Sequence, residues 1–233
     1  MSRFPEPAVR YVREALSAAA DPDRAAGMQA YMKTSMPFYG VQKSGRVPIV
    51  RHIVRTWPPA DQGEYEGLVL ALWGLPHREE KYIALGVARA HRRFVVPESL
   101  PLYRRLIVEG AWWDLVDEIA THLVRHLVVD HPAETWPEVD RWVDAPDMWL
   151  RRSALLCQIG AKDATDADRL FDFCRRRMAE REFFIRKAIG WALREYAKTD
   201  PGAVAGFVTK YRDELSSLSY REATKHIGHL VES

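Results

Sequence analysis

The segment FIRKAIG at residues 184–190 has two earlier counterparts in the chain, WLRRSAL at 149–155 and DLVDEIA at 114–120. The three segments begin 35 residues apart, and a fainter copy, EKYIALG, begins at Glu80, 34 residues before the first of them. A fixed period of this length is typical of stacked helix pairs, in which each pair packs on its neighbours. The repeat therefore predicts an array of helical hairpins.

Apolar residues recur with helical spacing through almost the whole chain, whereas alternating runs bounded by turn residues are missing. We expect about 13 helices, separated by short breakers that read DPD, WPPAD, GLPH, VVPES, DHPAE, DAPD and KTDPG. Helix starts are expected at Asp200, which precedes Pro201, and at Ser219, which would form a capping box with Glu222. No linker interrupts the pattern, so we expect one all-α domain over residues 1–233.

The period is close to that of TPR repeats, but the residues of the TPR signature are missing. We therefore expect HEAT-like helical repeats that form a curved right-handed solenoid, whose concave groove is the usual binding surface. Asp117, Arg152 and Lys187 hold the same position in three successive copies. Because equivalent positions of a solenoid form a ladder along one face, these three charges should line a shared groove.

The composition is that of an ordinary globular protein, with 233 residues, 47% of them hydrophobic and 28% charged. A net charge of +2 supports nucleic-acid binding only if basic residues gather on one face. Cys157 and Cys174 have no CxxC spacing, which favours a reducing compartment. No run approaches the roughly 18 apolar residues of a membrane span, and the N-terminal sequence lacks a continuous apolar signal core. We therefore expect a cytoplasmic protein that does not associate with membranes.

Residues 111–118 read AWWDLVDE, with two adjacent tryptophans and an aspartate one turn after the second. On a helical wheel Trp112 falls in the apolar stripe of its helix and is expected in the core. Trp113 and Asp117 lie off this stripe and adjacent to each other. Either Trp113 covers a neighbouring helix and Asp117 is solvated, or both face a ligand, and the pattern alone leaves both alternatives open.

Arg152 lies within the apolar stripe of its own helix. A cation there must reach a carboxylate, a phosphate or water, because an unpaired buried charge is too costly. An ion pair with an acid such as Asp117 and a functional role both satisfy this requirement. Trp191 lies off the buried stripe of a later helix, with Lys187 and Arg194 within one turn. This set suits a sugar–phosphate backbone, or a cation–π pair within the helix.

Three further features of the sequence bear on ligand binding. Gly190 lowers helix stability by about 1 kcal/mol relative to alanine, and would admit another backbone or a ligand close by. His122 and His126 lie one turn apart in HLVRH, but the glutamate of HExxH and a third ligand are missing, so we expect no metal site. The P-loop, dinucleotide-binding and GxSxG motifs do not occur, which argues against nucleotide binding and serine hydrolysis.

Four segments resemble the AlkD family of DNA alkylation repair glycosylases, namely WWDLVD, MWLRRSALL, EFFIRKAIGWALREYAKTDP and LSYREATKHI. The resemblance covers nearly the whole chain and is most specific from Trp112 to Ile227. Near the N-terminus, AYMKTSMPFYGVQ is similar to the family, but the following segment differs from it at Ser44, Arg46 and Val47.

The resemblance implies a HEAT-like superhelix that binds duplex DNA in its groove. It implies hydrolysis of the N-glycosidic bond of cationic bases, chiefly 3-methyladenine and 7-methylguanine, without the usual base flipping. It places the family's catalytic aspartate at Asp117 and its two sugar-facing tryptophans at Trp113 and Trp191. Its groove arginine falls at Arg152, and its DNA-contacting tyrosine at Tyr31.

The same resemblance leads to a set of expected roles. Asp117, Trp113 and Trp191 would act on the sugar, while DNA would be held by Arg152, Lys187, Tyr31 and Arg194. An alkylated purine leaves as a neutral base, so we expect no cofactor, no metal and no lyase activity. The expected partner is double-stranded DNA with alkylated bases, and binding to it would place the protein at the nucleoid. We expect a monomer without an obligate protein partner. The alternatives are an inactive relative that binds branched or distorted DNA, and a helical-repeat scaffold for a protein partner.

Overall fold

The computed structural model describes residues 5–231. These residues form α-helices with short 3₁₀ and π-helical stretches and contain no β-strand, which confirms the predicted all-α class. The chain divides into two compact units, Met1–Val95 and Val96–Ser233. Within residues 5–231, no helix has both the length and the apolar character needed to cross a membrane. The expectation of one domain over residues 1–233 stays a prediction.

The first unit is built from helices that pack through apolar residues spaced three or four apart. Its helices are α1 (Glu6–Ala18), α2 (Pro22–Met32), α3 (Lys43–Thr56), α4 (Gln62–Trp73), α5 (Arg78–Ala90) and the 3₁₀ turn η1 (Arg92–Phe94). α5 packs against α3 and α4, and α1 also contacts both of these helices. Val12 and Leu16 on α1 are buried, as are Ile49 and Ile53 on α3, so these stripes form part of the core.

Four consecutive charged residues at the start of α5, 78–81, are buried in the first unit. The carboxylate of Glu79 accepts hydrogen bonds from the backbone N–H groups of Tyr39, Gly40 and Val41 at 2.8–3.0 Å. Gly40 has a φ of +86°, and a Cβ there would collide with the backbone that precedes α2. A buried carboxylate thus fixes the loop before α3. The sequence pattern does not predict this, because a run of charges usually marks a solvated face.

The second unit continues the helical hairpins. Its helices are α6 (Leu100–Gly110), α7 (Trp113–Glu118), α8 (Arg125–Asp130), α9 (Pro132–Trp142), α10 (Met148–Leu156), α11 (Ala167–Arg177), α12 (Phe183–Tyr196), α13 (Pro201–Lys210) and α14 (Ser217–Thr224). Short 3₁₀ turns lie at η2 (Pro97–Ser99), η4 (Lys162–Ala164) and η5 (Gly228–Leu230), and a π-helical stretch, η3 (Ile119–Val124), joins α7 to α8.

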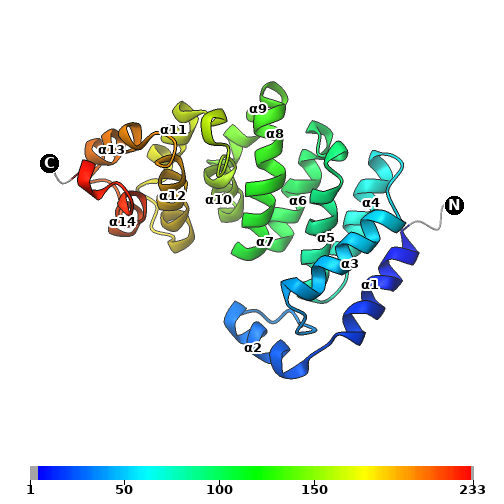
Figure 1. The fold of residues 1–233 in the computed structure, drawn as a ribbon. Helices are drawn as coiled ribbons and strands as arrows, with labels where there is room; N and C mark the ends of the chain where they lie inside the picture. Colours follow the sequence, from blue (N-terminus) through cyan, green and yellow to red (C-terminus); the bar gives the residue numbers. More distant parts are fainter. Residues whose placement is uncertain (1–4, 232–233) are drawn as a thin grey trace. The chain divides into compact units, whose positions relative to one another are not determined.

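Alternate helices of the second unit lie next to one another. α10 contacts both α7 and α12, and α12 makes its most extensive contact with α14, so these four helices form one row. The ribbon in Figure 1 shows α12 beside α14. α9, α11 and α13 are the connecting helices that pack against this row. The three sequence copies fall on α7 and η3, on α10 and on α12, which confirms the predicted helical repeat.

Aspartates inside the predicted breakers cap the helices that follow them. Asp21, Asp61 and Asp147 accept hydrogen bonds from backbone N–H groups in the first turns of α2, α4 and α10. Asp200 caps α13 in the same way, with Pro201 in the first turn, as the sequence predicts. The helix starts are thus specified locally.

The predicted cap at Ser219 is wrong, because α14 begins earlier. Its N-cap is Ser216, whose hydroxyl accepts from the Ser219 N–H at 3.0 Å. Ser219 is buried, and its own hydroxyl donates to the carbonyl oxygen of Arg186 on α12 at 2.9 Å. Glu222 is therefore not part of a capping box and has other partners.

The position of Trp112 also differs from the prediction. Its backbone is extended, with φ −155° and ψ 144°, and α7 begins only at the next residue. Its half-buried ring lies 6.1 Å from the ring of Trp149 and 5.6 Å from that of Phe184, between centroids. Trp112 thus packs in an aromatic cluster rather than in the helical stripe. The remaining members of the predicted stripe are buried: Val116, Ile119, Leu123 and Leu127.

Both cysteines lie inside the second unit. Cys157 and Cys174 are fully buried and form no disulfide. Burial raises the pKa of each thiol far above its ordinary value. The two sulfur atoms are therefore protonated at neutral pH.

Candidate functional site

Arg152 on α10 and Asp117 on α7 form a two-pronged ion pair. Arg152 Nε donates to Asp117 Oδ1 at 2.7 Å, and Nη2 donates to Oδ2 at 2.8 Å. The remaining terminal nitrogen, Nη1, donates to the carbonyl oxygen of Phe184 at the start of α12. Of the two alternatives for Arg152, the structure shows the ion pair with Asp117. The pair also confirms that two equivalent repeat positions meet.

The carboxylate of Asp117 is enclosed but keeps a small opening to solvent. Burial raises the pKa of Asp117, the hydrogen bonds and positive charge of Arg152 oppose this rise, and the nearby Asp114 adds to it. The Asp117 backbone oxygen accepts from the hydroxyl of Thr121 at 2.7 Å, and Thr121 lies on η3, which follows α7. Because a carboxylate has about four lone-pair directions, two remain for a water molecule or an adjacent positive charge.

Aromatic side chains lie close to this ion pair. Trp113 lies one turn before Asp117 on the same face of α7 and is half-buried. The rings of Trp149 and Phe184 lie 5.0 Å apart, and the guanidinium carbon of Arg152 lies 5.7 Å from the Phe184 ring centroid. Low polarity around the pair strengthens the attraction between its charges.

A second charged cluster lies on α12 and α14. Lys187 Nζ donates to Glu222 Oε1 at 2.6 Å, and Arg194 Nη1 donates to Glu222 Oε2. The hydrogen bond from Lys187 is the main cause that lowers the pKa of Glu222. Trp191, half-buried, stands between the two basic residues in the sequence of α12. The structure therefore brings Lys187 and Arg194 together through Glu222, which was not predicted as a site residue.

The repeat spacing provides a signal that points to Glu222. Lys187 and Glu222 are 35 residues apart, the same separation as Asp117 and Arg152. Extending the register by one more copy leads from Lys187 to Glu222. Gly190 explains the close contact of the two helices, since a Cβ there would lie 2.4 Å from Glu222 Cβ and 2.9 Å from the Ser219 carbonyl oxygen. Of the alternatives for Gly190, the structure shows the approach of another backbone.

Comparison with known families identifies the chain. A protein family described as DNA alkylation repair enzyme matches residues 12–227. The chain belongs to this family. One solved structure, a predicted DNA alkylation repair enzyme from Enterococcus faecalis, is 31% identical with a TM-score of 0.79, and the match covers 89% of this chain and 96% of that one.

A more distant structure shows the same fold. AlkD2 from Streptococcus mutans is 14% identical with a TM-score of 0.64, and the match covers 87% of this chain and 99% of that one. The comparison with curated proteins gave no match. This DNA alkylation repair family member therefore has the fold of AlkD-type helical-repeat proteins.

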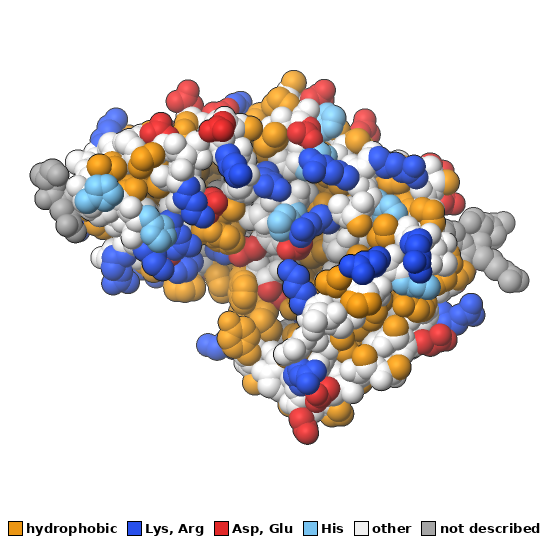
Figure 2. Space-filling model, in the orientation of Figure 1, with side chains coloured by type: hydrophobic (Ala, Val, Ile, Leu, Met, Phe, Trp, Pro, Cys, Tyr) orange, Lys and Arg blue, Asp and Glu red, His pale blue; other side chains and the backbone are white. Residues whose placement is uncertain are grey.

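Basic side chains of the repair-family protein gather on one part of the second unit. Figure 2 shows Lys and Arg side chains over α12 and α14. On α14, Arg221 is exposed, and Lys225 is exposed directly after the helix ends. Together with Lys187 and Arg194 they supply the local positive charge that a net charge of +2 does not guarantee.

Tyr31 belongs to the first unit, near the end of α2, and is highly exposed. The other predicted site residues all lie in the second unit. Tyr31 is thus available for contact with a partner, and its role in DNA binding stays a prediction.

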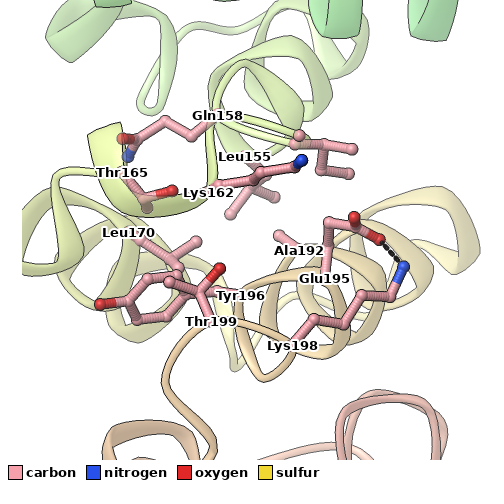
Figure 3. Close-up of a pocket in the computed structure, with 12 residues that line it drawn as sticks. Leu155, Gln158, Lys162, Thr165, Leu170, Ala192, Glu195, Tyr196, Lys198 and Thr199 are labelled. Carbon is pink, nitrogen blue, oxygen red and sulfur yellow. Dashed lines mark hydrogen bonds and ion pairs between the residues drawn. The ribbon is translucent and has the colours of Figure 1, made fainter.

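A cavity of about 140 Å³ in the second unit lies apart from these residues. Its lining residues lie at the end of α10 and just after it, around η4, on α11, and at the end of α12 and just after it; Figure 3 shows them as sticks. Leu155, Gln158, Ala192 and Tyr196 are among its lining residues, whereas Asp117, Trp113 and Trp191 are not. This cavity therefore does not provide a base pocket beside Asp117.

The two histidines considered for metal binding have carboxylate neighbours. His122 Nε2 lies 3.5 Å from Glu118 Oε2, and His126 Nδ1 lies 2.8 Å from Asp130 Oδ2. Each contact joins residues one turn apart. The part of the chain that the structure describes contains no group of three or more His, Cys, Asp or Glu side chains placed to hold a metal ion.

Proposed function

We propose that this member of the DNA alkylation repair family is a monofunctional DNA glycosylase. Its substrate would be duplex DNA that carries cationic alkylated purines such as 3-methyladenine and 7-methylguanine, and its reaction the hydrolysis of the N-glycosidic bond that begins base excision repair. The observation that carries the proposal is the Asp117 carboxylate, which forms a two-pronged ion pair with Arg152, keeps a small opening to solvent and lies one turn from Trp113 on α7.

The chemistry needs a negative charge more than it needs an acid. An alkylated purine already carries a positive charge and leaves as a neutral base, while positive charge develops on the deoxyribose. Asp117 stabilises that charge and orients the attacking water. The ring faces of Trp113 and Trp191 favour the same cationic sugar. No step requires a cofactor or a base drawn into a pocket.

Arg152 acts in this scheme by holding Asp117. Its three nitrogen atoms donate to Asp117 and Phe184, and its side chain is almost fully buried. A guanidinium in this position favours the ionised carboxylate and so opposes the rise in pKa that burial causes. We therefore assign Arg152 to positioning Asp117, and assign the contacts with DNA phosphates to Lys187 and Arg194, with Tyr31 as a further contact from the first unit.

Release of free base tests the proposal. Duplex DNA with 7-methylguanine is incubated with saturating enzyme, so that binding does not limit the rate. Asp117→Asn keeps the shape and removes the charge, and should slow release by about 10²–10³ while the affinity for DNA is retained. Trp113→Ala and Trp191→Ala should each slow release less, because neither tryptophan carries a formal charge.

Glu118→Gln is the matched control, since it removes one carboxylate from the next position of α7 and should leave the rate unchanged. Wild-type protein that releases no base would disprove the glycosylase proposal. A normal rate in Asp117→Asn would disprove the role of Asp117. Duplex binding without release would favour the inactive DNA-binding relative.

A further inference from the structure

Lys187 and Arg194 hold a carboxylate where a DNA phosphate is expected to bind. Both side chains reach the same group, Lys187 through Glu222 Oε1 and Arg194 through Oε2. A phosphate offers oxygen acceptors of the same charge sign to the same N–H donors. The carboxylate of Glu222 therefore satisfies, within the protein, the donors that would contact the DNA backbone.

The basic residues of this cluster are more exposed than Arg152, and Glu222 is slightly more exposed than Asp117. The side chains of Lys187, Arg194 and Glu222 are 38%, 22% and 19% exposed, whereas those of Arg152 and Asp117 are 4% and 14% exposed. A partly exposed ion pair contributes little net stability, so an incoming anion can replace the Glu222 carboxylate at little cost. A phosphate can reach Lys187 and Arg194 from solvent.

The backbone beneath Glu222 is fixed while its side chain can move. α14 lies so close to α12 at Gly190 that only a residue without Cβ fits there. The hydroxyl of Ser219, one turn before Glu222, donates to the Arg186 carbonyl oxygen and ties the two helices together. Exchange of the carboxylate therefore needs only rotation of the Glu222 side chain.

We infer that Glu222 occupies a phosphate-binding site formed by Lys187 and Arg194, and that a backbone phosphate of bound DNA displaces its carboxylate. The inference rests on the DNA-binding part of the proposed function. Trp191, which stands between the two basic residues on α12, would then lie beside the sugar attached to that phosphate. Glu222 reduces the affinity for DNA in general, because any duplex must displace it.

Binding of undamaged duplex by Glu222→Gln tests the inference. The variant keeps the shape of the side chain and removes the competing charge. It should bind about threefold to tenfold more tightly at low salt, and the plot of log affinity against log salt should steepen by about one. The measurement is fluorescence anisotropy of a labelled duplex across a salt series.

Two controls separate competition from a general change in charge. Glu195→Gln removes a carboxylate from α12, the helix that carries Lys187 and Arg194. Glu195 pairs with Lys198 at 2.6 Å on the side of α12 that lines the cavity, so this substitution should leave affinity nearly unchanged. In a Lys187→Met, Arg194→Met background, Glu222→Gln should no longer increase affinity. Equal tightening in either control would overturn the inference.

The unmodified protein gives a second readout that does not depend on the folding of a variant. With ¹³C-labelled glutamate, the side-chain carboxyl resonance of Glu222 should move to that of a solvated glutamate on saturation with duplex. An unmoved resonance, or a Glu222→Gln variant that binds no more tightly than wild type, would overturn the inference and leave the glycosylase proposal intact. Wild-type protein that binds no duplex would overturn both, whereas duplex binding without base release would overturn the glycosylase proposal alone.

Discussion

Two clusters of opposite charges lie in the same row of helices, and water reaches them to different extents. Asp117 and Arg152 join α7 to α10 through two hydrogen bonds, and their side chains are largely buried. Lys187 and Glu222 join α12 to α14 at the same sequence separation, together with Arg194, and remain accessible. If one member of the enclosed pair is removed, the other is left as an unpaired buried charge, which is costly. In the more exposed cluster, water can solvate any member that loses its partner, and another anion can take the place of Glu222. The degree of burial therefore determines how costly it is to separate each pair.

Arg152→Ala compared with Lys187→Ala tests this difference most strongly. Removal of Arg152 leaves the enclosed Asp117 without its partner, and should lower the free energy of unfolding by about 3–5 kcal/mol. Removal of Lys187 should cost about 0–1 kcal/mol, because Glu222 keeps Arg194 and solvent. Urea denaturation measures both values. Equal losses for the two variants would show that burial does not distinguish the pairs.

The pH dependence of base release sharpens the account of the enclosed pair. Burial raises the pKa of Asp117, so its carboxylate takes up a proton at a higher pH than an ordinary aspartate. Release should therefore fall as the pH falls through this raised pKa, towards the rate of Asp117→Asn, which is about 10²–10³ lower. The measurement is single-turnover release with the spontaneous rate subtracted. Glu118→Gln should keep the wild-type profile, and a flat wild-type profile down to about pH 4 would contradict the role of Asp117.

Substitution of Gly190 tests how closely α12 and α14 approach each other beside Glu222. Gly190→Ala places a Cβ against Glu222 and the Ser219 backbone, and should lower the free energy of unfolding by about 1–3 kcal/mol through overpacking. Gly206→Ala on α13 is the matched control, since no atom apart from its chain neighbours and the nearby backbone of its own helix lies within 4 Å of a Cβ there. It should raise stability by about 0.4–1 kcal/mol. Thermal unfolding of both variants checks this contrast, which would be lost if both gave the same sign.

Substitution of Glu222 should give the smallest effect on stability, and the size of this effect depends on pH. Its pKa is lowered in the folded protein, chiefly by the hydrogen bond from Lys187. Its stabilising contribution is therefore present above the unfolded pKa of about 4.3 and is lost as the pH falls through the folded value. Glu222→Gln should be about 0–1 kcal/mol less stable than wild type at neutral pH, with no difference in strong acid. Urea denaturation at both pH values measures this, and a constant difference would argue against the ion pair.

Features that depend on neighbouring residues could be predicted from the sequence. Asp147 and Asp200 cap helices because the N–H groups they bind lie two or three residues ahead. The stripe through Val116 and Leu127 is buried because the helical period itself fixes which residues share a face. Trp112 was misplaced because the helix begins one residue later, and a wheel has no information about where a helix starts.

Contacts between residues far apart in the sequence could be predicted only where both residues hold equivalent positions of the repeat. The register places Asp117 and Arg152 at equivalent positions, but only the fold shows that they bind each other rather than a ligand. Glu222 follows from the same register, yet its spacing from Ser219 resembled a capping box. The buried Glu79 has no such signal, because its partners lie 38–40 residues earlier in a loop that belongs to no repeat.

The burial of the two cysteines has a consequence for a protein of alkylation repair. Methylating agents are electrophiles, and the nucleophile in a cysteine is the thiolate rather than the thiol. Cys157 and Cys174 are shielded from solvent and their raised pKa values keep the sulfur protonated. The folded protein therefore presents neither thiol to the reagents that damage DNA, and it resists inactivation at these two positions while such reagents are present.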